Sequence, residues 1–295
     1  VPLIPMLCFL IIGLLGRKTP QKGGYIAIAG ALISFIIAAL ISYEHLTGDQ
    51  YPNPVTQSIE WFNIGDITIN LGFYVDGLTC MMMLFSSFIS TLIFIYSIGY
   101  MHAEGARKTR YYAEVSLFLT GMLGLIVSSN FLEMFIFWEV MGLCSYLLIG
   151  FYYTKPEAIA ASKKAFIVTR FADLGFLLGI LLLSYFTKTF SFELLTSGDA
   201  SVFAGAAGVT FMGASVMSWA LALIFIGGAG KSAMFPLHIW LPDAMEGPTP
   251  VSALIHAATM VVAGVFLVAR LFPVYVSAAP DVLVGIGYVG AFTSL

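Results

Sequence analysis

Long apolar runs, separated by short polar or Gly/Pro-containing segments, dominate the sequence. They predict membrane-spanning helices near the following ranges: 2–16, 24–43, 77–100, 112–128, 131–153, 162–186, 211–241, 250–272 and 282–295. The last run is cut off at Leu295 after about 14 residues, whereas a span needs about 20. We therefore expect an all-α polytopic membrane protein with eight spans and the start of a ninth, and read the chain as a fragment.

The run 211–241 is too long for one straight span. Its 31 residues would extend about 46 Å as a helix, against about 30 Å for the hydrocarbon core of a bilayer. Four residues that loosen or interrupt helices lie inside it: Gly227, Gly228, Gly230 and Pro236. We expect a discontinuous transmembrane helix that is broken at these positions.

Composition supports the membrane interpretation. Apolar residues make up 59% of the chain and charged residues 10%, and the mean hydropathy is +0.95. The formal net charge of −3 is too small to indicate nucleic acid as a partner. The cysteines form no CxxC pair and lie in apolar runs, which predicts packing rather than metal binding. No linker divides the chain, so 1–295 is expected to form a single transmembrane domain.

Basic residues alternate between successive connections. The first, third and fifth connections hold three each, whereas 44–76 and 129–130 hold none. The basic residues are Arg17, Lys18, Lys22, Arg107, Lys108, Arg110, Lys155, Lys163 and Lys164. The positive-inside rule then places these connections in the cytoplasm and the N-terminus outside a cytoplasmic membrane, with Arg270 as an exception. The segment 44–76, in which YPNP at 51–54 precedes alternating apolar residues, predicts an outside hairpin.

Glu139 is expected deep in the membrane. It lies nine residues after the turn at Asn130, or about 13–14 Å along a helix, near the middle of the hydrocarbon core. A carboxylate there costs at least ~2.5 kcal/mol unless it faces partners or water, so such residues tend to be functional. The alternative is a protonated glutamate that only hydrogen-bonds a neighbouring helix.

Arg170 and Asp173 lie on one face of the next helix, because their spacing is i, i+3. Asp173 lies about 15 Å along this helix from Lys163. The pair either locks helices together or acts as a charge pair whose opening modulates Glu139 and Lys231. Both interpretations stay open at the level of sequence.

The stretch GGAGKSAMFP at 227–236 contains the letters GKS, as phosphate-binding loops do. Such a loop also needs a glycine where Phe225 stands, and a strand where this chain has an apolar membrane run. Lys231 therefore needs a different reason. A buried lysine beside a helix break can load and release a proton, and discontinuous helices recur at ion sites in transporters. The alternative is a lysine that caps the carbonyls freed by the break.

Two histidines could extend a proton path. His256 lies six residues after Pro250, about 9 Å into its helix, and His238 follows Pro236 in the second half of the broken helix. Histidine titrates near neutral pH and could pass protons from Lys231 to later groups. A satisfied core histidine is the alternative. Haem ligation by His238 and His256, as in a membrane cytochrome, is disfavoured because the sequence has no second histidine at the spacing that two facing helices would supply.

These residues lie in segments that resemble one family. The segments are FWEVMGLCSYLLIGFYY at 137–153, VTRFAD at 168–173, GKSAMFPLHIWLPDAM at 230–245 and GPTPVSALIHAATM at 247–260. They resemble the antiporter-like subunit L family of complex I, the bacterial NADH:quinone oxidoreductase. The resemblance runs over nearly the whole chain and is densest from Trp138 to Arg270.

The resemblance implies two inverted five-helix repeats, each with a broken helix. By this resemblance 1–110 holds three leading helices, 111–272 the first repeat and 280–295 the start of the second. The transmembrane glutamate of the family corresponds to Glu139 and its broken-helix lysine to Lys231. Its Arg/Asp pair corresponds to Arg170 and Asp173, and its histidine after GPTPVSALI to His256.

The resemblance also implies proton translocation coupled to electron transfer in other subunits. No cofactor is expected in this chain, while NADH, FMN, Fe-S clusters and quinone are expected in partner subunits. The expected partners are the bilayer and other membrane subunits of complex I, especially the neighbouring antiporter-like subunit. Our hypothesis is that separation of Glu139 from Lys231 drives the lysine proton toward His256. Subunits of a multisubunit Na+/H+ antiporter or a membrane-bound hydrogenase, and a structural scaffold, are the alternatives.

Overall fold

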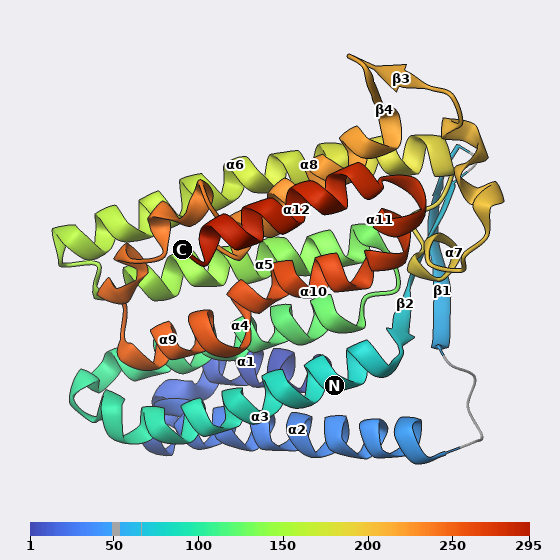
Figure 1. Ribbon diagram of the computed structural model, residues 1–295. Coiled ribbons are helices and arrows are strands. Elements are labelled where there is room, and N and C mark those ends of the chain that lie inside the picture. The colour runs from blue at the N-terminus through green and yellow to red at the C-terminus, as the bar shows by residue number, and fades with distance from the viewer. Residues whose placement is uncertain (49–53, 66) are drawn as a thin grey trace.

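The protein is a bundle of long helices that run side by side, with small strand segments at one end (Figure 1). The computed structural model describes residues 1–48, 54–65 and 67–295. The longer elements of the first half are α1 Leu3–Leu15, α2 Gly24–Thr47, β1 Val55–Ile64, β2 Ile67–Val75, α3 Gly77–Tyr100, α4 Lys108–Val127 and α5 Phe131–Ile149. Those of the second half are α6 Pro156–Thr187, α7 Phe192–Leu195, β3 Thr210–Phe211, β4 Ala214–Ser215, α8 Val216–Lys231, α9 Thr249–Ala253, α10 Met260–Arg270, α11 Phe272–Ala278 and α12 Pro280–Thr293.

The helices confirm a multi-pass membrane protein. Within the described part of the chain, five helical segments are long and apolar enough to cross a membrane: Pro20–Thr47, Gly77–Val127, Phe131–Tyr152, Pro156–Thr187 and Thr249–Arg270. The second of these turns back at the short helix η3, Met101–Arg107, and therefore contains both α3 and α4. Val216–Lys231 and Pro280–Thr293 are shorter apolar helices.

The basic connections gather at one end of the bundle. Lys108 Nζ donates to Gln21 Oε1 at 3.4 Å, which joins the connection before α2 to the connection before α4. The guanidinium groups of Arg107 and Arg110 lie 5.4 Å and 5.6 Å from the ring centre of Tyr153, just before α6. The first, third and fifth connections therefore share one end, as the alternation of basic residues predicted.

The predicted hairpin lies at the opposite end. β1 and β2 pair antiparallel, from Val55 opposite Val75 to Ile64 opposite Ile67. Asn130 Nδ2, in the α4–α5 turn, donates to Asn70 O at 2.6 Å and so ties the hairpin to the bundle. The first part of the hairpin motif, at 51–53, lies outside the described residues.

The long apolar run 211–241 is broken, but not where its glycines lie. β3 and β4 occupy 210–215, and α8 then runs through Gly227, Gly228 and Gly230 before it ends at Lys231. The chain resumes helical turns only in the short helix η6, Leu237–Trp240. The expectation that the glycines mark the break is therefore wrong, whereas Pro236 does lie within the interruption.

The glycines of α8 instead allow helices to approach closely. A Cβ at Gly227 would clash with Phe176, and one at Gly230 would clash with Ala172, both on α6. On another side, a Cβ at Gly264 of α10 would clash with the backbone of Gly228. Because these glycines carry no side chain, α8 can lie directly against α6 and α10, which brings Lys231 close to the polar residues of α6.

Replacement of Gly230 by valine is expected to destabilise the bundle. The added side chain meets Ala172 at a tightly packed contact, and overpacking of this kind costs about 1–3 kcal/mol. Gly287→Val on α12 is the matched control, because no atom lies within 4 Å of a Cβ there. Thermal unfolding of the detergent-solubilised full-length protein measures the difference, and equal melting temperatures for the two variants would contradict the role given to Gly230.

Candidate functional site

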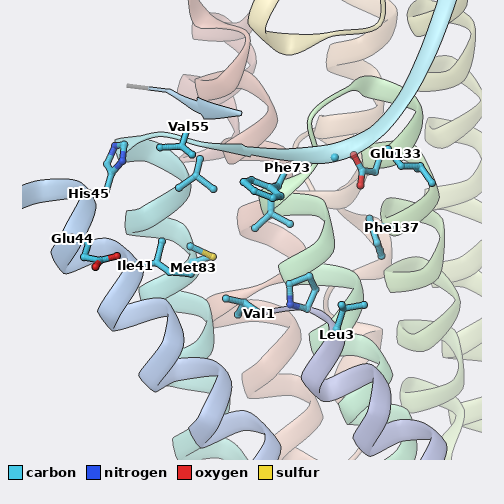
Figure 2. A pocket seen from close by; sticks show the side chains of 15 residues that line it. Val1, Leu3, Ile41, Glu44, His45, Val55, Phe73, Met83, Glu133 and Phe137 are labelled. Carbon is cyan, nitrogen blue, oxygen red and sulfur yellow. The ribbon is translucent and has the colours of Figure 1, made fainter. Parts of the chain in front are cut away.

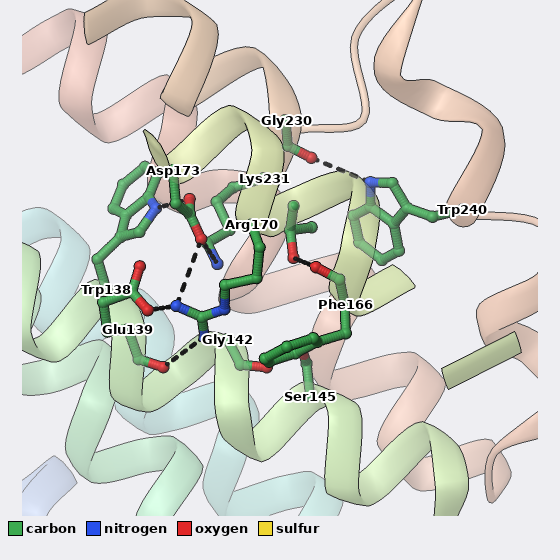
Figure 3. Close-up of polar contacts among 11 residues, drawn as sticks. Trp138, Glu139, Gly142, Ser145, Phe166, Arg170, Asp173, Gly230, Lys231 and Trp240 are labelled. Carbon is green, nitrogen blue, oxygen red and sulfur yellow. Dashed lines mark hydrogen bonds and ion pairs between the residues drawn. The ribbon is translucent and has the colours of Figure 1, made fainter. Parts of the chain in front are cut away.

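Four predicted residues meet in one ion cluster inside the bundle (Figure 3). Glu139 comes from α5, Arg170 and Asp173 from α6, and Lys231 from the last position of α8. We call these four residues the ion cluster. Its members lie on three helices, and the cluster forms because α6 packs against both α5 and α8.

The buried half of the ion cluster is a Lys–Asp pair. Lys231 Nζ lies 3.1 Å from Asp173 Oδ2, and the two residues are 0% and 2% exposed. Trp138 Nε1 donates to the other oxygen, Asp173 Oδ1, at 2.7 Å. The ammonium group also lies 5.8 Å from the ring centre of Trp138. Both oxygens of Asp173 are thereby engaged, as a carboxylate buried in an apolar bundle requires.

The other half of the ion cluster is less buried and pairs Arg170 with Glu139. The guanidinium forms an ion pair with the Glu139 carboxylate, and Arg170 Nη2 donates to Glu139 O at 3.1 Å. These side chains are 24% and 30% exposed, respectively. Arg170 Nη1 also lies 3.8 Å from Asp173 Oδ2. Arg170 therefore connects the two carboxylates, one at the edge of the helix bundle and one inside it.

The structure corrects the predicted partner of Lys231. The sequence-based hypothesis paired the lysine with Glu139, whereas its ion-pair partner is Asp173 and that of Glu139 is Arg170. The physical reason is the close contact of α6 with α8 at Gly230, which places Asp173 nearest to the ammonium group. Depth along α5 identified Glu139, but depth does not determine which neighbouring side chain a residue meets.

Lys231 is not needed to cap the end of α8. The carbonyl of Gly228 accepts from Ser232 N at 2.9 Å, and that of Ala229 accepts from Met234 N at 2.9 Å. Trp240 Nε1, from η6, donates to Gly230 O at 3.0 Å. These donors satisfy three carbonyls in the last turn of α8, so the ammonium group remains available for Asp173.

Gly142 leaves room for the two cations. A Cβ at this position on α5 would lie 2.6 Å from Lys231 Nζ and 2.9 Å from Arg170 Nη2. Lys231 also lies at the C-terminal end of α8, where the partial negative charge of the helix favours a cation. The end of the α8 backbone therefore favours a positively charged Lys231, although this side chain is not exposed to water.

The ion cluster is electrically balanced. Two carboxylates and two cations give a formal charge of zero when all four are ionised. A buried charge with a partner costs far less than one without, which lets the cluster persist inside a bilayer. No group of three or more His, Cys, Asp or Glu residues suited to a metal ion occurs among the described residues. Four ionisable side chains this close to one another can exchange ion-pair partners and protons.

The two histidines lie apart from these ion pairs. His256 lies in a π-helix, Leu254–Ala258, which packs against α3 and α10. Its ring is half-buried, and Nε2 has no hydrogen-bond partner among the described residues. His238 is exposed and stacks on Phe235 with ring centres 5.7 Å apart. Within the described chain neither shares a hydrogen bond or ion pair with the ion cluster, so their relay role stays a prediction.

One cavity lies away from the ion cluster (Figure 2). Its volume is about 660 Å³, and it lies at the hairpin end between the starts of α1 and α3, α2 and the strands. Apolar side chains such as Ile41, Phe73 and Met83 line most of it, and Glu133 reaches it from α5. None of the residues that line this cavity belongs to the ion cluster.

The contacts of three polar residues were not predicted from the sequence. Trp138 precedes Glu139, and a buried indole N–H needs an acceptor, which could have signalled its bond to Asp173. Arg270, the exception to the charge rule, is buried and donates to Asp76 Oδ2 at 2.6 Å. Glu114 on α4 is buried beside Arg110. The predicted span began at 112, whereas α4 begins at Lys108 and places Glu114 deeper.

Comparison with known proteins identifies the family. A family model described as "NADH:quinone oxidoreductase/Mrp antiporter, TM" matches residues 128–295, and one described as "NADH-Ubiquinone oxidoreductase (complex I), chain 5 N-terminus" matches residues 61–112. The first match holds all four residues of the ion cluster.

Individual relatives agree with this assignment. NADH-quinone oxidoreductase subunit L of Neisseria meningitidis is 42% identical over 100% of this chain and 44% of its own length. F(420)H(2) dehydrogenase subunit L of Methanosarcina mazei is 44% identical over 100% of this chain and 44% of its own length. A chain of the Mrp complex from a Dietzia species superposes with a TM-score of 0.71 and 28% identity, covering 90% of this chain and 27% of that one.

The chain spans less than half the length of these relatives. The fold nevertheless agrees with the Mrp structure over 90% of the chain. Because the family model covers more than half of the chain and the identity extends over all of it, the chain belongs to the NADH:quinone oxidoreductase/Mrp antiporter transmembrane family, as the sequence motifs indicated.

Proposed function

We propose that this chain is part of a membrane subunit that translocates protons for a respiratory NADH:quinone oxidoreductase. The observation that carries the proposal is the fully buried Lys231, whose ammonium group pairs with the Asp173 carboxylate. Trp138 donates a hydrogen bond to the same carboxylate, and Arg170 lies close to it. An ionisable residue inside a membrane is expensive and marks an ion or proton path by default. Family membership and the names of the relatives support the same function.

Arg170 is proposed to control the lysine. Asp173 Oδ2, which pairs with Lys231 at 3.1 Å, also lies 3.8 Å from Arg170 Nη1. When Arg170 leaves Glu139, it can move toward this oxygen and compete with the ammonium group. Coulomb interactions at low dielectric change strongly over such distances, so Lys231 loses its counter-charge and releases a proton. Return of Arg170 to Glu139 restores the Lys–Asp pair and reloads the lysine.

The trigger is proposed to act at Glu139. Its side chain is 30% exposed at the edge of the helix bundle, where a neighbouring antiporter-like subunit can approach. A new charge or a protonation event there changes the hold of Glu139 on Arg170. Electron transfer would take place in other subunits, which carry NADH, FMN, Fe-S clusters and quinone, and would reach this chain as a conformational or electrostatic change.

The orientation follows from the two ends of the bundle. The basic connections around Arg107 and Tyr153 are proposed to face the cytoplasm, and the β1–β2 hairpin the outside of the inner membrane. The relatives act with different electron donors by their names, and one superposed structure is an Mrp complex. Copurification of the full-length protein with NADH dehydrogenase activity distinguishes the proposed complex from an antiporter or an F(420)H(2)-dependent one.

Replacement of Lys231 by alanine is expected to remove the contribution of this subunit to pumping. The proton carrier is lost, so the number of protons translocated per NADH oxidised falls in vesicles that contain the assembled complex. Lys164→Ala is the control, because this exposed lysine pairs with Asp243 at 2.8 Å outside the ion cluster. An unchanged ratio in an assembled Lys231→Ala complex would refute the carrier role.

Asp173→Asn is expected to destabilise the protein by leaving Lys231 without its counter-charge. Removal of one partner from a buried pair costs about 3–5 kcal/mol. The double variant Asp173→Asn with Lys231→Met removes both charges and is expected to recover most of the loss, because the two residues are directly coupled. Thermal unfolding of the solubilised protein tests this, and additive effects of the two substitutions would show that the pair is not coupled.

A further inference from the structure

A second buried carboxylate lies outside the ion cluster. Glu114 is six residues after the start of α4 at Lys108, or about 9 Å from the basic end of the bundle. Only 7% of the residue is exposed. An acidic side chain is almost never this buried unless its oxygens are paired, and an intramembrane carboxylate is a candidate functional group.

Glu114 is only half satisfied. Arg110 Nε donates to Oε1 at 2.6 Å, and the Arg110 side chain is 40% exposed at the basic end. The second oxygen, Oε2, is buried and has no hydrogen-bond partner among the described residues. A salt bridge with Arg110 explains the first oxygen but not the second. A buried acceptor without a donor is a place where a proton can bind.

Glu114 lies between the basic end of the bundle and the ion cluster. α4 and α5 pack antiparallel, since a Cβ at Gly124 would meet Phe137 and one at Gly121 would lie 3.1 Å from Met141 N. Glu114 is seven residues before Gly121, two turns nearer the basic end on the same face of α4.

We propose that Glu114 is a proton-loading site that supplies the ion cluster. Its oxygen Oε2 takes a proton from the aqueous phase at the basic end and becomes a neutral carboxylic acid. The same O–H then gives the proton to water near α5, and the carboxylate is restored. Arg110 holds Oε1 and orients the group. This inference rests on the proposed function and adds the residue at which protons enter from the basic end.

The test measures protons translocated per NADH oxidised in vesicles that contain the assembled full-length complex. Glu114→Gln is expected to lower this ratio as much as Lys231→Ala, because the amide cannot bind and release the proton. Glu114→Asp keeps a carboxylic acid and is expected to retain most of the ratio. Glu157→Gln, an exposed carboxyl group at the same end of the bundle, is the matched control and is expected to leave the ratio unchanged.

Each outcome separates this inference from the proposed function. A normal ratio in Glu114→Gln beside a lowered ratio in Lys231→Ala overturns the loading site and leaves the proposed function standing. Equal losses in Glu114→Gln and Glu114→Asp also overturn it, because they indicate a structural ion pair whose geometry matters. A normal ratio in Lys231→Ala overturns the proposed function itself.

If Glu114→Gln fails to assemble, a double variant tests the proposal instead. Glu114→Gln alone leaves Arg110 without its partner, whereas Glu114→Gln combined with Arg110→Gln removes both charges together. This double variant also lacks the carboxyl group, so the loading site predicts the same lowered ratio. A normal ratio in the assembled double variant overturns the proposal.

Discussion

A lysine charge held inside a bilayer is the constraint on which the rest of the structure depends. Lys231 is fully buried, and the Asp173 carboxylate 3.1 Å away makes this possible. The carboxylate is in turn held by Trp138, and the lysine by its place at the end of α8. The glycines of α8 allow the close contact with α6 that brings the two charges together. Loss of the Asp173 carboxylate would leave the buried lysine charge without its ion-pair partner.

The interruption after α8 serves this pair indirectly. A helix end inside a membrane exposes carbonyls that must find donors. Ser232, Met234 and Trp240 donate hydrogen bonds to three carbonyls in the last turn of α8. These carbonyls therefore do not need the ammonium group of Lys231, which pairs with Asp173 instead. The interruption therefore places a cation at the end of α8, and this cation is not needed as a hydrogen-bond donor to the carbonyls there. The proposed change in the protonation of Lys231 would therefore leave the hydrogen bonds of the helix end intact.

In the proposed mechanism, Arg170 is the residue that allows the ion cluster to switch. It forms an ion pair with Glu139 and approaches Asp173, the partner of Lys231. A balanced group of two acids and two bases can exchange partners without changing its total charge, which keeps the cost of each arrangement low. An effect at the exposed edge can thus reach the buried lysine through one guanidinium. The proposed loading site at Glu114 would extend the same chemistry toward the basic end of the bundle, where protons are available from water.

Run length, depth and motif spacing in the sequence determined the membrane class, the family, the discontinuous helix and the residues of the ion cluster, because each of these depends on position along the chain. Tertiary structure decided that Lys231 pairs with Asp173 and Glu139 with Arg170. It also decided that Gly227, Gly228 and Gly230 pack rather than break the helix, and that Glu114 is buried. The physical reason is that periodicity reports how deep a side chain lies on its own helix, whereas its partner depends on how neighbouring helices rotate and approach.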